Sequence, residues 1–551
     1  MTRATPRSKI SRRALLKGSA LATGAFFVGG RVSRAMQVGL PASPPTTPWL
    51  WPLAFSPHAV PLPPGVLPNP LPIPENHQRW DEFEPVKYYD MPIGEGLHFA
   101  HPQLPGSLAS CYNNMLPGPT FVARYGEPMF VRWRNQLPTV LQGFGNCDVI
   151  THVHNGHHAS ESDGFPADCY SPGFFKDHHY PNIYAGGDPA EAKSTLWYHD
   201  HRLDYTAQNT VRGLAGFYIL FDQHDSGDEN DPNPDAFRLP SGIPNGNDVA
   251  NKFDIPMVLT DRTYNAAGNL TIDPMNMDGL LGDKFLVNGR IQPYFNVQRR
   301  KYRFRILDGG PSRFYDLWFS NGMNFQVIGN DGNLLPAPVT QNHHVLSVAE
   351  RVDIIVDFSQ LPANVTELYL VNRAEQIDGR GPSGITLPMS QANQLLKFNI
   401  MPAPTPVPDP SRVPAVLKPM PAMNLPVARR RTWVFGRQNG MWTVNNLLFD
   451  PSRSDAYVKQ NTAEVWTLKN GGGGWAHPIH IHLEEYHLLE RNKRPVVSGS
   501  ERARKDVFRL GAGEEVKIYC KFRDFLGRYP MHCHNTLHED HAMMVRFDII
   551  P

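Results

Sequence analysis

The chain has 551 residues, a length that predicts about two to four domains. Charged residues make up 19% of it and the formal net charge is +1, so the composition indicates neither a nucleic-acid partner nor an acidic membrane surface. No run of about 18 or more apolar residues occurs, and the sequence therefore predicts no ordinary membrane-spanning helix.

The first 35 residues have the three regions of an export signal. Ser11–Lys17 contains two adjacent arginines and resembles the twin-arginine motif, Gly18–Gly30 is weakly apolar, and Ser33–Ala35 offers a small-residue cleavage site. We predict that residues 1–35 are a signal peptide handled by the twin-arginine export machinery, and that the mature protein is periplasmic or secreted from a bacterium. The alternative for this segment is a disordered basic tail.

Two proline-rich segments divide the rest of the chain. Residues 36 to about 75 are expected to form an extended arm on the body of the protein, and Met401–Pro426 has the composition of a linker between domains. We therefore predict a first domain with its arm at 36–240, a second domain at 241–400, a proline-rich linker at 401–428 and a third domain at 429–551.

A loose pattern of strands recurs three times along the chain. Each copy has a short strand, a turn, and a strand in which apolar and polar residues alternate. Helical periodicity is scarce, and the 53 prolines disfavour long helices. The sequence therefore predicts an all-β protein built from three antiparallel β-sandwiches. The three copies lie at 117–135, 285–307 and 442–470.

Four His-x-His pairs are the main chemical signal of the sequence. Successive side chains of a strand point to opposite faces, so the two histidines of a pair point the same way and can reach one metal ion or a close pair of ions. A single pair carries little weight, because 23 histidines make roughly one such pair expected by chance. Four pairs are an excess. They are His152/His154, His199/His201, His480/His482 and His532/His534.

The cysteine between the last two of these histidines gives the pattern its specificity. A thiolate with two imidazoles and a weak thioether describes a blue-copper site. Strand alternation directs Cys533 toward one metal and its neighbours His532 and His534 toward another cluster. Two short covalent paths therefore connect a site that receives single electrons with a site that holds several metal ions.

The order and form of these motifs resemble those of multicopper oxidases, the group that contains laccases, bilirubin oxidase and spore-coat laccases. The resemblance extends over about residues 110 to 551 and includes the spacing between the motifs. It implies three cupredoxin-like Greek-key β-sandwich domains. It also implies four copper ions (Cu), one of type 1, one of type 2 and two of type 3.

The resemblance further implies a role for each ligand position. His477, Cys533 and His538 correspond to the type 1 ligands, and Met543 to the weak axial ligand. Methionine at this position resembles bacterial members of the family rather than fungal laccases, and it implies a modest type 1 potential. The type 2 positions are His152 and His480, and the type 3 positions are His154, His199, His201, His482, His532 and His534.

Two acids resemble acids that spore-coat laccases place near the copper cluster and on its O₂-exit side. Asp163 follows the first histidine pair by the same interval, and Glu539 directly follows His538. Reduction of O₂ consumes protons as well as electrons, so we expect both carboxyl groups to relay protons. The alternative is that either one is a solvated loop acid. The remaining histidines are predicted to be surface or supporting groups, including His157, His158, His178, His179, His343, His344 and His541.

The five cysteines leave at least one outside disulfides in an oxidising compartment. Cys533 is the one assigned to a metal. The other four can form up to two bridges or stay as buried thiols, and the sequence alone does not pair them. They are Cys111, Cys147, Cys169 and Cys520.

These features predict an exported, laccase-like oxidase that takes single electrons from phenols or aromatic amines and reduces O₂ to two waters. One alternative keeps the copper sites but oxidises Cu(I), Fe(II) or Mn(II), which requires carboxylates or methionines near His477. Another is a periplasmic copper-binding or scaffold protein without enzymatic activity. The sequence leaves the physiological electron donor and the oligomeric state open.

Overall fold

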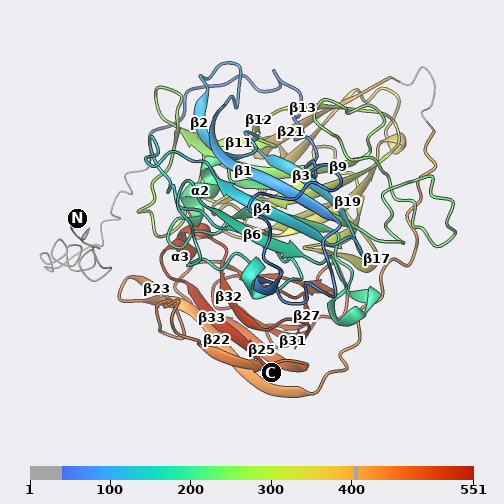
Figure 1. Cartoon of the computed structure of the whole chain (residues 1–551). Coiled ribbons are helices and arrows are strands. Elements are labelled where there is room, and N and C mark those ends of the chain that lie inside the picture. The colour runs from blue at the N-terminus through green and yellow to red at the C-terminus, as the bar shows by residue number, and fades with distance from the viewer. Residues whose placement is uncertain (1–39, 403–407) are drawn as a thin grey trace, which may run out of the picture. The chain divides into compact units, whose positions relative to one another are not determined.

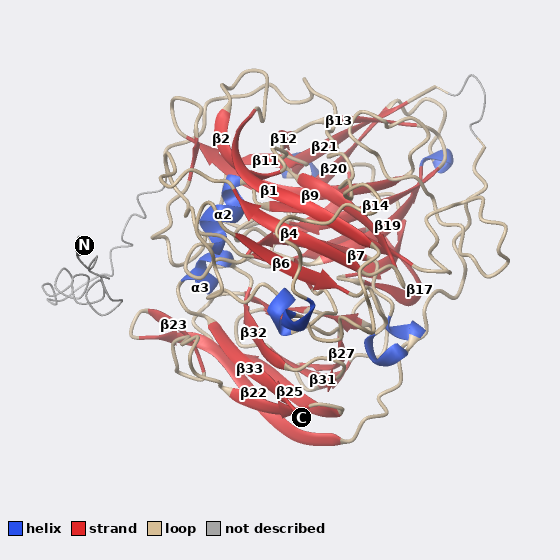
Figure 2. Ribbon diagram, viewed as in Figure 1, coloured by secondary structure: helices blue, strands red, loops and turns tan. Residues whose placement is uncertain are grey.

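The computed structural model describes residues 40–402 and 408–551, and strands dominate them (Figure 1, Figure 2). The export signal that the sequence predicts at 1–35 lies outside these residues. Two short α-helices occur in the described part of the chain, α2 (Thr206–Arg212) and α3 (Thr536–Asp540). None of the helices described is long and apolar enough to cross a membrane.

The first sandwich packs two four-stranded sheets around an aromatic core. Trp133 and Tyr198 are buried in this core and come from different sheets. One sheet, in the order β2-β1-β4-β6, consists of β1 (Lys87–His98), β2 (Ser107–Tyr112), β4 (Met129–Asn135) and β6 (Phe175–Tyr180). The other, in the order β3-β8-β7-β5, consists of β3 (Gly118–Arg124), β5 (Thr151–His154), β7 (Thr195–Asp200) and β8 (Ala215–Phe221).

The second sandwich encloses the largest apolar core, to which Phe304 and Phe398 contribute from opposite sheets. Its larger sheet, in the order β12-β11-β9-β14-β19-β16-β17 with β10 on β9, comprises β9 (Asp254–Tyr264), β10 (Leu270–Thr271), β11 (Lys284–Val287), β12 (Arg290–Ile291), β14 (Lys301–Asp308), β16 (Phe325–Asn330), β17 (Asn333–Gln341) and β19 (Arg351–Asp357). The smaller sheet, in the order β13-β21-β20-β15-β18, comprises β13 (Tyr294–Val297), β15 (Tyr315–Phe319), β18 (His343–Leu346), β20 (Glu367–Asn372) and β21 (Asn393–Ile400).

The third sandwich buries Cys533 and Met543 in its core together with Trp466. Its larger sheet, in the order β23-β22-β25-β31-β27-β28 with β29 on β27, comprises β22 (Val427–Gln438), β23 (Met441–Val444), β25 (Thr462–Asn470), β27 (Tyr486–Arg491), β28 (Arg494–Pro495), β29 (Arg504–Lys505) and β31 (Glu515–Phe522). The smaller sheet, in the order β24-β33-β32-β26-β30, comprises β24 (Ala456–Lys459), β26 (His477–Ile481), β30 (Val507–Leu510), β32 (Gly527–Cys533) and β33 (Met544–Ile550).

The three sandwiches share one pairing pattern. Their first strands, β1, β9 and β22, pair in parallel with β4, β14 and β25. The same first strands pair antiparallel with β2, β11 and β23. Parallel neighbours within a largely antiparallel sheet require a connection that leaves the sheet and returns, as in a Greek key. The predicted all-β fold of three sandwiches is confirmed.

The short strand of the predicted repeat ends at an asparagine in all three sandwiches. Asn113, Asn288 and Asn445 follow β2, β11 and β23 and have positive φ angles of 51°, 48° and 51°. Asparagine tolerates this left-handed backbone better than other residues with a Cβ atom. In the first sandwich the short strand of the repeat is therefore β2. The short strand that the sequence predicted at the start of the copy 117–135 is instead β3, which lies in the other sheet of the first sandwich.

The proline-rich arm after residue 39 is extended and joins two sandwiches. The backbone N–H groups of Leu53 and Ala59 donate hydrogen bonds to Tyr294 in the second sandwich (2.7 Å) and to Thr120 in the first (2.8 Å). The second proline-rich segment contacts the second sandwich through Leu417, whose N–H donates to the carbonyl of Pro336 at 2.9 Å. The boundaries at 240 and 401–428 stay predictions, because residues 40–551 form one compact unit.

Candidate metal centre

The four His-x-His motifs lie on two pairs of neighbouring strands. In the first sandwich β5 pairs with β7, and His152 lies opposite His199. In the third sandwich β26 pairs with β32, and His480 lies opposite His532. Each strand pair contributes four rings, and all eight are at most 1% exposed. We call this set the histidine cluster: His152, His154, His199, His201, His480, His482, His532 and His534.

Two groups of three histidines within the cluster bring their ligand atoms within 4.8 Å of one another. In the group formed by His201, His482 and His532, Nε2 of His532 lies 3.1 Å from Nε2 of His201 and 3.3 Å from Nε2 of His482. Neutral imidazole nitrogens that face each other at this distance are compatible when a metal ion accepts their lone pairs. The groups are His154, His199 and His534, and His201, His482 and His532.

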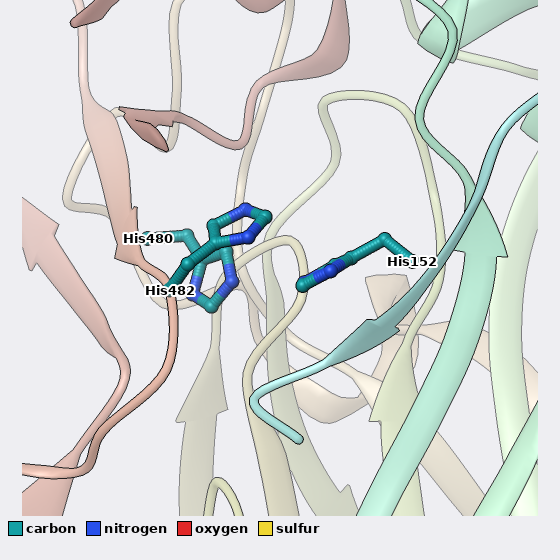
Figure 3. A group of neighbouring side chains, drawn as sticks. All are labelled: His152, His480 and His482. Atoms are coloured by element: carbon teal, nitrogen blue, oxygen red, sulfur yellow. The ribbon is translucent and has the colours of Figure 1, made fainter. Parts of the chain in front are cut away.

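A third group combines His152 with His480 and His482. Figure 3 shows His480 and His482 extending from one strand toward His152, which comes from a strand on the other side. The rings of His152 and His482 stack with their centroids 3.8 Å apart. Nε2 of His152 and Nε2 of His480 are buried and have no hydrogen-bond partner among the described residues. Buried polar atoms of this kind normally have a partner, so both nitrogens fit metal ligands.

The outer nitrogens of these rings are held by protein oxygens. Nδ1 of His152 donates to the backbone carbonyl of Asp163 (2.5 Å), and Nδ1 of His480 donates to that of Asp506 (3.0 Å). Since a carbonyl only accepts, the proton lies on Nδ1 and the lone pair on Nε2 points into the cluster. Burial lowers the pKa of the imidazoles and keeps them in the neutral form that binds metal, as for His152, His154, His199, His201, His482, His532 and His534.

A fourth group, which we call the cysteine site, comprises His477, Cys533 and His538 of the third sandwich. Sγ of Cys533 lies 3.5 Å from Nδ1 of His477 and 3.5 Å from Nδ1 of His538, and these two nitrogens are 3.2 Å apart. All three side chains are fully buried. Burial raises the pKa of the Cys533 thiol. A thiolate at this position therefore requires a bound cation, as a copper–thiolate site provides.

Strand β32 and the turn after it connect the cysteine site with the histidine cluster. Cys533 lies between His532 and His534, and these two histidines belong to different groups of three. The structure thus brings together all eleven histidines and cysteines that the sequence assigned to strong metal ligands. They form two sites joined by three adjacent residues at the end of β32.

Comparison with known proteins connects this geometry to a family. Residues 103–225 and 422–551 each match a family model described as multicopper oxidase. Over 496 residues the chain is 36% identical to bilirubin oxidase of Albifimbria verrucaria, an alignment that covers 87% of this chain and 80% of that protein. The chain belongs to the multicopper oxidase family. It is accordingly an oxidoreductase that uses oxygen, and copper is the metal that this family implies.

Other multicopper oxidases are similar over nearly the whole chain. A laccase of Bacillus subtilis is 31% identical over 535 residues, covering 87% of this chain and 97% of that protein. The crystal structure of a laccase from Pediococcus acidilactici superimposes with a TM-score of 0.69 at 26% identity, covering 93% of this chain and 96% of that chain. The structural match confirms the cupredoxin-like fold of the three sandwiches.

Asp163 is buried in this multicopper oxidase. It lies directly after a 3₁₀ turn at Ser160–Ser162 and has no exposed surface. Its Oδ2 accepts a hydrogen bond from Nδ1 of His482 at 2.8 Å, while its Oδ1 has no hydrogen-bond partner among the described residues. Burial raises the pKa of this carboxyl group. The alternative of a solvated loop acid is wrong for Asp163.

Glu539 is also buried, and it contacts the other two rings of the group formed by His201, His482 and His532. Its Oε2 is 3.1 Å from Nδ1 of His532, and its Oε1 is 3.5 Å from Nδ1 of His201. The hydroxyl of Thr206 donates to Oε1 at 2.8 Å, so the start of α2 fixes the position of the carboxyl group. Burial raises the pKa of Glu539. It too is no solvated loop acid.

Sequence reasoning missed Asp506, which contacts two rings of the cluster. Its Oδ1 lies 3.0 Å from Nε2 of His154, and its carbonyl accepts from His480. Burial alone would raise the pKa of this carboxyl group, but the paired guanidinium of Arg351 lowers it below its usual value. Asp506 stands between β29 and β30, without a motif around it, so only the folded structure reveals it.

Two tryptophans and two arginines lie between the cysteine site and the surface above it, with Trp442 fully buried and Trp475 half-buried. The ring of Trp442 lies 4.0 Å from that of His538 between centroids, and Trp442 meets Trp475 edge-on at 5.3 Å. The guanidinium carbons of Arg380 and Arg437 lie 4.8 Å and 5.2 Å from the centroid of Trp475. No sequence motif indicated these four residues.

Asp278 connects both of these arginines with the cysteine site. Its carboxylate accepts hydrogen bonds from Arg437 (2.8 Å) and Arg380 (3.1 Å). Its backbone oxygen lies 3.3 Å from Nε2 of His538, the nitrogen that faces away from Cys533. The loop around Asp278 therefore orients a ligand ring of the cysteine site from the second sandwich.

Met543, the predicted axial ligand, is fully buried in the same core as Cys533. Its N–H donates to the carbonyl of His538 (3.0 Å), and its carbonyl accepts from the N–H of Cys533 (3.1 Å). These backbone bonds hold Met543 beside two residues of the cysteine site. Its role as axial ligand stays a prediction.

Several of the remaining histidines and cysteines are more buried than surface groups would be. Four of the histidines predicted to be surface or supporting groups are at most 8% exposed, and they are therefore buried supporting groups: His157, His158, His178 and His179. All five cysteines are free thiols in the structure, so the four that the sequence left unassigned form no bridge there. Cys111 and Cys520 are buried, whereas Cys147 and Cys169 are half-buried.

Proposed function

We propose that this protein is a laccase-like oxidase that takes single electrons from phenolic or aromatic amine donors and reduces O₂ to two waters. The observation that carries the proposal is the continuity of His532, Cys533 and His534 between the cysteine site and the histidine cluster. One site can therefore receive electrons while the other holds O₂. Three adjacent residues at the end of β32 provide a short path between them.

We assign four copper ions to the two sites. The cysteine site is the type 1 site, with Met543 as its weak axial ligand. The type 2 ligands are His152 and His480, and the two groups of three histidines hold the type 3 pair. Copper bound there supplies one-electron transfer and the reduction of O₂. The protein's part is to orient the rings, exclude water and deliver protons.

Asp163 and Glu539 are proposed to deliver those protons. Each is buried against the histidine cluster, and they contact different rings of it. The unpartnered Oδ1 of Asp163 is available to hold a proton or a water molecule. Oε1 of Glu539 is bonded to the hydroxyl of Thr206, which provides a second exchangeable proton.

The donor class follows from the surface above the cysteine site. Trp475 is half-buried and contacts Trp442, which is fully buried against the rings of His477 and His538. A planar aromatic donor can stack on a partly exposed ring such as that of Trp475. The nearby arginines bring positive charge that disfavours a metal cation. An aromatic donor fits this surface better than a metal ion.

A metal oxidase remains the second candidate, because Met275 and Asp278 lie in the loop that reaches the cysteine site. Met275 is 70% exposed, and a thioether binds Cu(I). However, the carboxylate of Asp278 is already bonded to Arg380 and Arg437. A cation would have to displace both arginines to use this acid.

Oxygen consumption by the copper-loaded protein separates the two candidates. We expect turnover with a panel of phenols and aromatic amines, and little or none with Cu(I), Fe(II) or Mn(II). Faster turnover with a metal ion than with every aromatic donor would favour the metal oxidase. No oxygen consumption with any donor, despite full copper loading, would favour the copper-binding or scaffold protein.

We also propose export by the twin-arginine route and a periplasmic or secreted location, on the sequence of residues 1–35. Cell fractionation with and without the two arginines in Ser11–Lys17 tests this. Retention of the unchanged precursor in the cytoplasm would contradict it.

A further inference from the structure

Asp506 is the point at which all three sandwiches meet the histidine cluster. It belongs to the third sandwich, its Oδ1 lies 3.0 Å from Nε2 of His154 in the first, and Arg351 at the start of β19 pairs with it from the second. The side chains of Asp506, His154 and Arg351 have no exposed surface. Their mutual orientation is therefore set by protein contacts alone.

The guanidinium of Arg351 fixes the plane of the Asp506 carboxylate. Nη1 of Arg351 donates to Oδ1 at 2.8 Å and Nη2 donates to Oδ2 at 2.6 Å, which is the two-pronged geometry that best orients a carboxylate. Arg351 is itself anchored, because its Nε donates to the carbonyl of Thr195 at 3.2 Å. Thr195 begins β7, the strand that carries His199.

The fixed carboxylate determines which nitrogen of His154 faces the cluster. The ionised Oδ1 only accepts, so Nε2 of His154 carries the proton and donates to it. Nδ1 of His154 is left bare, and it is buried without a hydrogen-bond partner among the described residues. In His152 and His480 the unpartnered nitrogen is Nε2, so His154 presents its opposite nitrogen to the cluster.

A second acid holds the backbone around Asp506 independently of Arg351's side chain. Oδ2 of Asp331, in the second sandwich, accepts from the N–H groups of Asp506 and Val507, each at 3.2 Å. It also pairs with Nζ of Lys505 at 2.9 Å. A change of the Arg351 side chain therefore leaves the Asp506 backbone attached and frees chiefly its carboxylate.

We propose that Arg351 is a positioning residue for copper in the histidine cluster. Acting through Asp506, it holds the ring of His154 with Nδ1 toward the metal, and it makes copper binding between the first and third sandwiches depend on the second. The inference rests on the proposed assignment of copper to the cluster. Arg351 affects the copper loading and the geometry of the histidine cluster, and it does not affect the cysteine site.

Arg351→Lys and Arg351→Gln test the proposal, with Arg303→Lys as the matched control. Arg303 is an equally buried arginine of the second sandwich that pairs with Asp225 and Asp353. Each protein is loaded with copper alone and compared with the wild type by copper content per chain, blue absorbance, the type 2 signal in electron paramagnetic resonance and thermal unfolding of the copper-free form.

We expect both Arg351 variants to keep the blue absorbance per chain while the affinity of the cluster for copper falls about 10- to 100-fold, the usual effect of losing a partner that orients a ligand. The type 2 signal should weaken or change shape, more in Arg351→Gln than in Arg351→Lys. Arg303→Lys should retain the wild-type copper content and spectrum, even if it unfolds at a lower temperature.

Two results would overturn the proposal: wild-type copper content and resonance spectrum in Arg351→Gln, or an equal loss of cluster copper in Arg303→Lys. If Arg351→Gln does not fold, Arg351→Lys decides the question by the same readouts. The wild-type protein tests the proposed function separately. A wild type that binds no copper in the cluster contradicts that function, whereas a fully loaded wild type with unchanged Arg351 variants contradicts only this inference.

Discussion

The cysteine site and the histidine cluster use similar ligands but depend on different parts of the molecule. The three residues of the cysteine site all come from the third sandwich and its last helix. The histidine cluster takes four rings from the first sandwich and four from the third, and Arg351 reaches it from the second. The cysteine site therefore takes its three residues from one sandwich and only a supporting contact, from Asp278, from another. The cluster takes its rings from two sandwiches and forms only when these are docked.

This difference predicts that the two sites can be disabled separately. Cys533→Ser should have the largest effect, abolishing the blue absorbance and reducing donor oxidation to background, because serine does not supply a soft thiolate. The type 2 resonance signal should persist, because the proposed type 2 ligands are other residues. Absorbance spectroscopy, electron paramagnetic resonance and oxygen consumption measure these effects.

Cys520→Ser is the control for that change, because Cys520 is another fully buried free thiol of the third sandwich. It should keep the blue absorbance even if stability falls. Blue absorbance that persists in Cys533→Ser would refute the assignment of the cysteine site.

Asp163→Asn should affect the cluster and spare the cysteine site. The asparagine oxygen can still accept from Nδ1 of His482, but the side chain no longer holds and releases a proton. Loss of a group that transfers protons typically slows a reaction by about 100-fold or more. In stopped-flow measurements we expect anaerobic reduction of the blue absorbance at the wild-type rate and slow reoxidation by O₂.

Asp168→Asn is the matched control, because Asp168 lies on the same loop and pairs with Arg528 near the surface. Its reoxidation should equal that of the wild type. Equal rates for Asp163→Asn and the wild type would remove Asp163 from proton delivery.

The sequence predicted the ligands of both sites but not what holds them in place. Strand alternation and motif spacing depend on neighbours in the chain, so His532, Cys533 and His534 could be assigned to two sites without a structure. The contact of Asp506 with His154 joins residues 352 positions apart. Such contacts arise only when separate sandwiches dock, and no local pattern encodes them.

The prediction of the fold also failed where local patterns do not determine which sheet a strand joins. Alternating strands predict three sandwiches, but residues 117–124, which have the local pattern of the short strand of the repeat, form β3 in the other sheet of the first sandwich. Trp442 and Asp278 escaped the sequence reasoning for a related reason. They reach the cysteine site from β23 and from a loop of the second sandwich, far from the ligands in the chain.

Met543→Leu should change the cysteine site by a smaller amount and leave the cluster unchanged. Removing the weak thioether ligand destabilises the oxidised copper, so the type 1 reduction potential should rise. A redox titration of the blue absorbance measures the shift. Met544→Leu is the control, because Met544 is an equally buried methionine that packs in a different apolar cluster. Equal potentials in Met543→Leu and wild type would exclude Met543 as a ligand.

Arg437→Gln should have the smallest effect, limited to donor binding. It removes one of the two arginines bonded to Asp278 above the cysteine site while leaving the ligands in place. We expect KM for aromatic donors to change more than kcat, with an unchanged blue absorbance. Arg430→Gln, an exposed arginine of the same strand, should behave as the wild type. A fall in kcat with no change in KM would place Arg437 outside the donor surface.

In the proposed function, one site accepts electrons and the other reduces O₂ through the connection at Cys533. The most direct test is to bleach the blue absorbance of the copper-loaded protein with a phenol under anaerobic conditions and then mix it with O₂. We predict that the blue absorbance returns with the first turnover and that O₂ is reduced to water without release of hydrogen peroxide. A bleached protein that O₂ does not reoxidise, or one that releases hydrogen peroxide in amounts equal to the O₂ consumed, would contradict the account.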